Sequence, residues 1–124
     1  MSIKLPNKKK MNRTTPVLTD INDLLAYAQG HGYDRLAFKY YEIGKLKEMS
    51  YGEFYDMACR VAAGFDKIGL AGKRVAVIGD TSPQWLATYV GALASGTVIV
   101  PMDKELAVPE IEKFIESVNV EAVV

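Results

Sequence analysis

Two short apolar runs in this 124-residue chain are each followed by side chains that can do chemistry. Asp80 and Ser82 come after the run 75–78, and Asp103 comes after the run 98–100. If both runs are parallel strands, these side chains meet at the carboxyl edge of one sheet, where ligands favour binding. Carboxylates there bind a metal ion or a sugar hydroxyl, and a serine can act as a nucleophile. The competing interpretation gives both aspartates turn or capping roles and makes Ser82 a helix cap.

The other candidates for catalysis or metal binding stand alone in the sequence. His31 has no cysteine or second histidine near it, which favours a surface or turn position over a metal ligand. Cys59 has no histidine partner, so we interpret it as structural and not as a nucleophile. The sequence contains no G-x-G-x-x-G, no G-x-x-x-x-G-K-[S/T], no metal-spaced cluster and no catalytic triad. The residues taken alone therefore predict no active site.

Composition excludes several classes of protein. Acidic and basic residues balance at 15 each, which argues against a general nucleic-acid binder. One cysteine excludes internal disulfides and suits a cytoplasmic location. No apolar run approaches the length of a membrane span, so we predict no stable membrane insertion.

The chain begins with a basic segment that we predict to be separate from the folded part. We expect residues 1–15 to form a basic flexible tail and residues 16–124 to fold. The alternative for the tail is a weak contact with anionic lipid or a polyanion. Its basic residues are Lys4, Lys8, Lys9, Lys10 and Arg13.

The segment 74–103 must position the candidate side chains. After the first apolar run, Pro83 stands at the first helical position behind its serine cap. Residues 85–95 are apolar nearly all round, which indicates a helix buried on most faces, and Gly96 supplies its end. Pro101 closes the second run. Strand, helix and strand at this length predict a right-handed βαβ unit with a parallel pair covered on two faces.

A second crossover extends this unit. Pro109 begins a predicted helix, and residues 120–124 read as a third parallel strand. We expect the apolar stripe of the helix to pack on the sheet, so that Phe114 is a core residue and Phe114→Ala costs roughly 3–5 kcal/mol. The stripe consists of Ile111, Phe114, Ile115 and Val118. The predicted fold class is three-layer α/β, with a short parallel sheet joined by βαβαβ crossovers.

Three elements precede the sheet. Residues 19–29 predict an amphipathic helix that ends at Gly30, and runs on either side of Gly44 predict a small β-hairpin over 36–41 and 46–49. Ser50 then begins a helix with a capping box, because a glutamate stands three residues later. The predicted buried stripe of this helix is Phe54, Ala58, Val61, Phe65 and Ile68.

Three stretches, in this order, resemble the start of the AMP-forming, adenylate-forming enzymes, the acyl-CoA synthetase superfamily. The stretches are MSYGEFYDMACRVAAGFDKIGL, GKRVAVIGDTSPQWLATYVGALASGTVIVPMD and PEIEKFIESVNVEAVV, and the resemblance covers roughly residues 35–124. The amino-acid sequence around Trp85 and Pro101 is most similar to the corresponding sequences of long-chain fatty acyl-CoA synthetases.

Three family patterns carry the resemblance: (T/S)Y-x-E, N-(S/C)-x-E-(W/F) and G-x-(V/I)-x-V-P. Thr81 takes the usual place of the asparagine and Gln84 that of the glutamate, so the second pattern is matched only in part. The matching positions are Ser50, Tyr51 and Glu53 for the first pattern, Ser82 and Trp85 for the second, and Gly96, Val98, Val100 and Pro101 for the third.

The resemblance implies an enzyme that activates a carboxylic acid, here a fatty acid, with ATP and Mg²⁺ to an acyl-adenylate. The acyl group then passes to coenzyme A. The family's catalytic motifs, including one resembling T-S-G-T-T-G-x-P-K-G, are absent, so no catalytic residue and no metal ligand is carried over. Lys113 is the one position that the resemblance places near the nucleotide end of coenzyme A, and a solvated lysine is the alternative.

The resemblance also implies that the chain is the truncated N-terminal part of an AMP-binding domain. We expect it to be inactive alone, to hold no cofactor, to meet its acid substrate only through the rest of the enzyme, and to form a homodimer that covers its apolar surface. Two alternatives remain: a free-standing flavodoxin-like binding or receiver module, and an interaction domain without catalysis.

Overall fold

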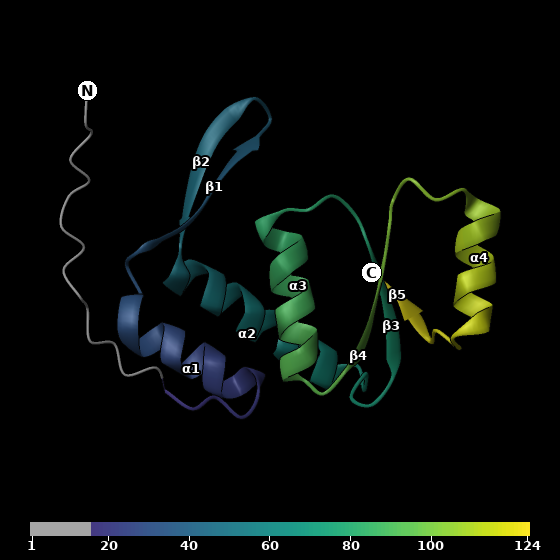
Figure 1. Ribbon diagram of the computed structural model, residues 1–124, viewed down its shortest axis with the longest axis horizontal. Coiled ribbons are helices and arrows are strands. Elements are labelled where there is room, and N and C mark those ends of the chain that lie inside the picture. The colour runs from purple at the N-terminus through teal and green to yellow at the C-terminus, as the bar shows by residue number, and fades with distance from the viewer. Residues whose placement is uncertain (1–15) are drawn as a thin grey trace, which may run out of the picture.

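The computed structural model describes residues 16–124, so the predicted tail at 1–15 lies outside the described residues. Four helices and five strands follow one another in this part of the chain. Figure 1 labels them. They are α1 (Ile21–Gly32), β1 (Leu36–Glu42), β2 (Lys45–Ser50), α2 (Tyr51–Lys67), β3 (Arg74–Ile78), α3 (Pro83–Ala94), β4 (Val98–Met102), α4 (Val108–Ser117) and β5 (Ala122–Val123).

The parallel sheet has the strand order β4-β3-β5, which confirms the predicted α/β class. Val75 of β3 pairs with Ile99 on one side and with Ala122 on the other, both in parallel. The chain therefore moves one way across the sheet through α3 and returns through α4. Two right-handed crossovers in opposite directions place these helices on opposite faces. In the order β4-β3-β5 the topological switch point, the place where open α/β sheets bind ligands, lies at the carboxyl ends of β3 and β5.

The core lies where α2 and α3 meet the sheet. A buried cluster contains Phe65 of α2, Leu70, Val75 of β3 and Ala92 of α3. The prediction that α3 is buried on most faces is confirmed, because no residue from 85 to 95 is fully exposed. Small residues let the two helices approach closely.

Helix α2 begins with the predicted capping box. The Ser50 hydroxyl accepts a hydrogen bond from the Glu53 backbone N–H at 3.1 Å, and a Glu53 carboxylate oxygen accepts one from the Ser50 N–H at 2.7 Å. Both bonds satisfy donors that a helix start leaves without a partner.

Replacing Ser50 with alanine is expected to lower the free energy of unfolding by about 1 kcal/mol, the usual loss when an N-cap side chain is removed. Urea unfolding of the two proteins measures the difference. Thr81→Ala is the matched control, since Thr81 is exposed and lies outside any helix, and it is expected to stay within about 0.5 kcal/mol. An unchanged midpoint for Ser50→Ala would contradict the capping assignment.

The predicted boundary of α1 is wrong. The helix starts at Ile21 behind an Asp20 cap and runs through Gly30 to Gly32, so Gly30 does not end it. His31 lies in the last helical turn and not in a following turn, with its ring stacked on Tyr27 at 4.2 Å between centroids. This stacking and one further helical turn outweigh the cost of a helical glycine, which is about 1 kcal/mol.

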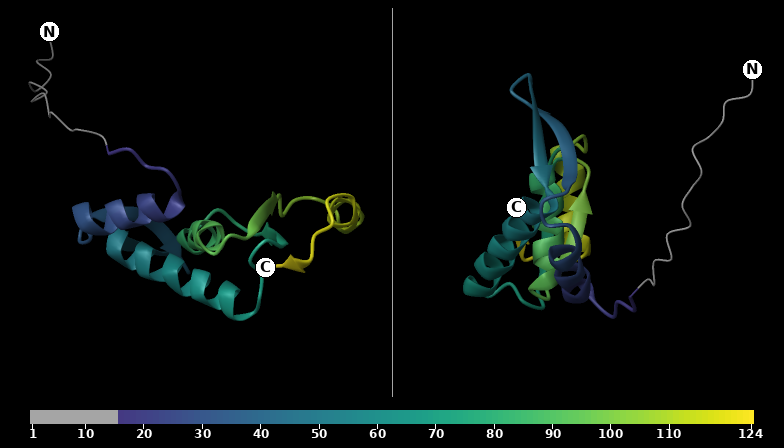
Figure 2. Two further views of the ribbon diagram at one scale, coloured as in Figure 1. Left: turned by 90° about the horizontal axis from the view of Figure 1, so that it is seen from below. Right: turned by 90° about the vertical axis from the view of Figure 1, so that its left-hand side faces the viewer.

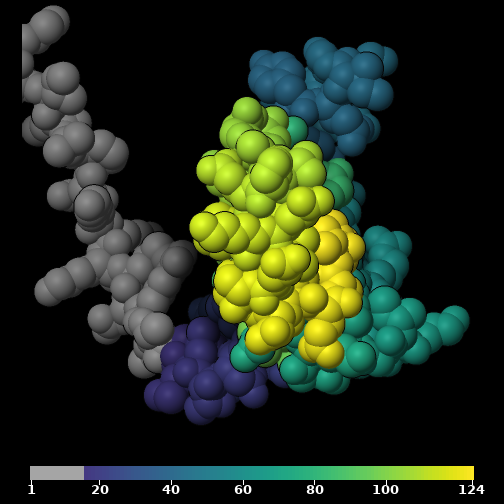
Figure 3. Space-filling view, turned by 90° about the vertical axis from the view of Figure 1, so that its right-hand side faces the viewer, coloured from purple at the N-terminus to yellow at the C-terminus, as the bar shows by residue number. Residues whose placement is uncertain are grey.

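The hairpin of β1 and β2 is confirmed, with slightly longer strands than predicted. Its two-residue turn consists of Ile43 at φ 50° and Gly44 at φ 71°. Positive φ at both positions is the type I′ geometry that matches the twist of a hairpin. The hairpin projects from the helical layer, and in Figure 3 it stands above the rest of the surface.

Helix α4 contradicts the prediction that its stripe packs on the sheet. None of its residues is buried, and Phe114 is 49% exposed. Figure 2 shows α4 at the end of the molecule beside β5, apart from α1 and α2. Because β5 has only two residues, the sheet offers too little surface there to cover a helix. Phe114 is therefore not a core residue, and its predicted cost of 3–5 kcal/mol is wrong.

Three smaller predictions also fail. Ile68 is 68% exposed, because it caps α2 and lies beyond the last turn of its buried stripe. Strand β4 continues through Pro101 to Met102, and its Val98 is 48% exposed, so this strand is not covered on both faces. Proline is tolerated because β4 is the edge of the three-stranded sheet and needs no donor on its outer side.

Candidate functional site

The carboxyl ends of β3 and β4 bring together the residues that the sequence singled out. Asp80 follows β3 and Asp103 follows β4, as the parallel arrangement predicted. Lys104 Nζ lies 2.5 Å from Asp80 Oδ1, so an ion pair joins the loops that follow β3 and β4. The hydrogen bond to Asp80 and the negative charge of that carboxylate raise the pKa of Lys104 above its ordinary value. At neutral pH the site therefore carries a paired cation and anion.

The remaining polar groups at these strand ends are used locally. Ser82 Oγ accepts a hydrogen bond from the Trp85 backbone N–H at 3.1 Å, which confirms its role as the cap of α3. Asp103 Oδ1 accepts a hydrogen bond from the Glu105 N–H at 2.9 Å, which confirms a turn role. Asp80 instead holds Lys104, a pairing that neither sequence interpretation included.

A hollow of about 260 Å³ lies beside this edge of the sheet. Trp85 contributes to its lining. The indole Nε1 of Trp85 is buried without a hydrogen-bond partner among the described residues, and the indole ring stacks on Tyr89 at 5.6 Å between centroids. Few polar side chains line the hollow, and among them Asp80 is the one that carries a charge. Its residues include Gly79, Asp80, Ser82, Gln84, Trp85 and Thr88.

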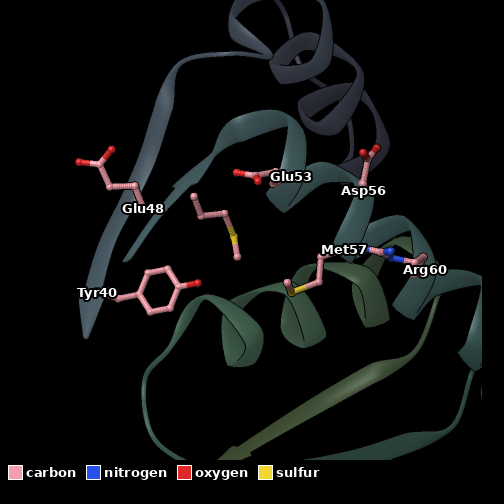
Figure 4. A pocket seen from close by; sticks show the side chains of 7 residues that line it. Tyr40, Glu48, Glu53, Asp56, Met57 and Arg60 are labelled. Carbon is pink, nitrogen blue, oxygen red and sulfur yellow. The ribbon is translucent and has the colours of Figure 1, made fainter. Parts of the chain in front are cut away.

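A second hollow, of about 250 Å³, lies between the hairpin and α2. Figure 4 shows acidic side chains from both elements around it, with Arg60 at one side. These acids already have structural partners. Glu53 closes the capping box, Asp56 accepts a hydrogen bond from the Tyr33 hydroxyl at 2.8 Å, and Glu48 pairs with Lys39 at 2.8 Å. The bond to Asp56 raises the pKa of Tyr33.

The described residues assemble no catalytic or metal-binding centre. Residues 16–124 contain no cluster of three or more histidine, cysteine, aspartate or glutamate side chains placed to hold a metal ion. Cys59 is exposed on α2, away from the buried stripe as predicted, and its contact with Tyr55 raises the pKa of that phenol. None of the helices in residues 16–124 combines the length and the apolar composition that a bilayer crossing requires.

Lys113 lies on α4 with an exposed side chain, on the far crossover from the Asp80–Lys104 pair. Its predicted contact with coenzyme A stays a prediction. The residue that the sequence reasoning missed is Lys104. The sequence shows only a lysine two residues after the second strand, and its position facing Asp80 depends on the register of the two strands.

The family model of AMP-binding enzymes matches residues 24–124. Among curated relatives, the chain is 31% identical to the D-alanine–D-alanyl carrier protein ligase of Bacillus velezensis over 61% of this chain and 16% of the relative. It is 34% identical to a human long-chain-fatty-acid–CoA ligase over 53% of this chain and 9% of the relative. The chain therefore corresponds to a minor part of the relatives that it matches.

Solved structures of other proteins share the fold of this chain. The N-terminal domain of FACL13 from Mycobacterium tuberculosis matches with a TM-score of 0.75 and 26% identity, over 86% of this chain and 26% of that one. A fatty acyl CoA synthetase from Mycobacterium tuberculosis matches with a TM-score of 0.74 and 27% identity, over 84% of this chain and 20% of that one. The arrangement of hairpin, helices and parallel sheet is thus shared with N-terminal parts of such proteins.

Proposed function

The chain belongs to the AMP-binding enzyme family, and we propose that it is the N-terminal portion of an acyl-CoA synthetase. The whole enzyme activates a carboxylic acid, and specifically a fatty acid, with ATP and Mg²⁺ to an acyl-adenylate. It then transfers the acyl group to coenzyme A, in the cytoplasm. The observation that carries the proposal is the match to the family model over residues 24–124 by a chain with the corresponding fold.

The acid and the acceptor are argued from the relatives. A human relative and a palmitoyl-CoA ligase of Gibberella moniliformis both bear names that state a fatty acyl group and coenzyme A. The fatty acyl CoA synthetase of Mycobacterium tuberculosis shares the fold at 27% identity. These names support a fatty acid as the acid and coenzyme A as the acceptor.

The residues of this chain do not fit a Mg²⁺–ATP site. The sequence has no glycine-rich phosphate loop, and residues 16–124 hold no metal-binding cluster. We therefore assign no step of adenylation to this chain. Its part in the proposed enzyme is to hold the loops after β3 and β4 in place. Lys113, as an exposed cation, suits a phosphate of coenzyme A, and this contact is proposed as part of the same function.

A second candidate function is activation of D-alanine for a carrier protein. It is favoured by the 31% identity to the Bacillus velezensis ligase, which covers more of this chain than the human relative does. The two candidates share the adenylation step and differ in the acid and in the thiol that accepts it.

ATP–pyrophosphate exchange by the full-length product of the gene that encodes this sequence tests both candidates. Exchange that depends on palmitate is expected, and exchange that depends on D-alanine alone would replace the first candidate by the second. The 124-residue chain itself is expected to stay at background with either acid, since the donors that stabilise the reacting phosphates are absent from it. Acid-dependent exchange by the short chain would overturn that assignment.

We further propose that the isolated chain self-associates as a homodimer. Apolar side chains on α4 and after it are open to solvent, with Phe114 49% and Val124 52% exposed. Exposed apolar side chains favour association, and a two-fold dimer is the simplest closed arrangement that covers them. Light scattering across a dilution series is expected to show a mass that rises with concentration. A stable monomer at high micromolar concentration would contradict the proposal.

A further inference from the structure

The tip of the hairpin exposes three large apolar side chains far from the core. Ile43 in the turn is 96% exposed, Tyr41 is 76% exposed and Leu46 is 55% exposed. Tyr41 and Leu46 are direct cross-strand partners, so they lie on the same face of the hairpin, with Ile43 beyond them. The hairpin rises away from the body of the molecule, which leaves this tip clear on its outer side (Figures 1 and 3).

Ile43 also occupies a strained backbone position. Its φ of 50° belongs to the left-handed region, where a β-branched residue is a genuine outlier. Asparagine, aspartate or glycine is the usual choice at this position of a type I′ turn. Ile43 therefore combines an unfavourable backbone conformation with an almost fully exposed apolar side chain. Its exposure means that packing within residues 16–124 does not offset the cost of either feature. An outlier of this kind motivates a functional explanation.

The charges around the tip favour an anionic partner. Lys47 is paired with Glu42, and Lys39 is paired with Glu48 at 2.8 Å. Lys45, next to the turn and exposed, has no salt-bridge partner among the described residues, so the hairpin carries one positive charge in excess. An apolar tip flanked by a tyrosine and a lysine is the composition found where proteins enter the headgroup region of a bilayer.

We propose that this tip inserts shallowly into the surface of an anionic lipid bilayer. Ile43 and Leu46 enter the boundary of the acyl chains, Tyr41 lies at the level of the headgroups, and Lys45 contacts lipid phosphates. A protein partner fits less well, because a two-residue turn with its flanking pair is much smaller than the roughly 800 Å² that each partner buries in a stable interface. Binding through one such tip is weak and reversible.

Co-sedimentation of the full 124-residue chain with vesicles tests the proposal. The vesicles contain phosphatidylcholine alone or phosphatidylcholine with phosphatidylserine. The wild type is expected to bind the anionic vesicles, and Ile43→Asn is expected to reduce the bound fraction at least about fivefold. Asparagine tolerates the left-handed conformation, so this variant is expected to melt no lower than the wild type. Loss of binding then cannot come from unfolding.

The matched control is Ile68→Asn, the same substitution at a residue that is 68% exposed on the body of the molecule. It is expected to bind like the wild type, and Lys45→Gln is expected to weaken binding to anionic vesicles only. Equal binding by all variants would place the contact on the basic residues of 1–15 and overturn the proposal. Absence of binding by the wild type would overturn it too. So would a drop in self-association of Ile43→Asn with vesicle binding unchanged, since the occupant would then be a second copy of the chain.

Discussion

Replacing Phe65 with alanine is expected to lower the free energy of unfolding by about 3–5 kcal/mol. The Phe65 side chain is 8% exposed and packs with Leu70, Val75 and Ala92 between α2, α3 and the sheet. Two of these neighbours, Val75 and Ala92, have no exposed surface, so they cannot move in to fill the space that the ring leaves. The substitution thus loses the burial of the ring and creates a cavity. Urea unfolding followed by circular dichroism measures the loss, which is large relative to the stability of a small domain.

Phe114→Ala in α4 is the matched control for this prediction. The same chemical change is made, but at a ring that is 49% exposed on a helix without buried residues. Its cost is expected to be below about 1.5 kcal/mol, since little burial is lost and solvent already reaches the site. Equal losses for the two variants would contradict the position of the core between α2, α3 and β3.

Replacing Gly91 with alanine is expected to cost about 3 kcal/mol, at the upper end of the range for overpacking. A Cβ at this position of α3 would lie 2.4 Å from the Ala58 carbonyl oxygen and 2.7 Å from Val61 Cβ, both in α2. A backbone atom cannot turn aside as the end of a flexible side chain does, so the two helices have to separate. Separation loosens the packing that the core cluster depends on. Thermal or urea unfolding measures the cost.

Gly64→Ala is the control with the opposite expected sign. Gly64 lies inside α2, and nothing stands within 4 Å of the place where its Cβ would be. Alanine in a helix interior is favoured over glycine by about 1 kcal/mol. A stabilised Gly64→Ala beside a destabilised Gly91→Ala separates the close helix crossing from the general effect of glycine in helices. Two variants with the same sign would contradict the crossing.

Local signals in the sequence predicted most of the fold. The capping box at Ser50 and the cap at Ser82 depend on residues three positions apart, so the sequence contains everything that forms them. The parallel pairing of β3 with β4 follows from the length and apolar character of the helix between them. These features confirmed the predicted α/β class, and they placed Asp80 and Asp103 at one edge of the sheet.

Features that depend on residues far apart in the sequence could not be predicted from such local signals. The period of the stripe in α4 predicts an apolar face, but it does not state how much sheet is available to cover Phe114. The pairing of Asp80 with Lys104 depends on the register of two strands and on the path of both loops. Gly91 appears in the sequence as one more small residue in an apolar helix, and only the crossing with α2 shows why a side chain is not accommodated there.

The central position of β3 also has a consequence for synthesis on the ribosome. The Arg74 carbonyl accepts a hydrogen bond from the Glu121 N–H at 2.8 Å, from a residue 47 positions later in the chain. At roughly 5–20 residues per second, the ribosome needs about 2–9 s to supply that partner. Throughout this interval one edge of β3 lacks its neighbour, and such an edge invites pairing with other chains. The nascent chain therefore remains open to a holding chaperone even after β4 has been made, until β5 emerges.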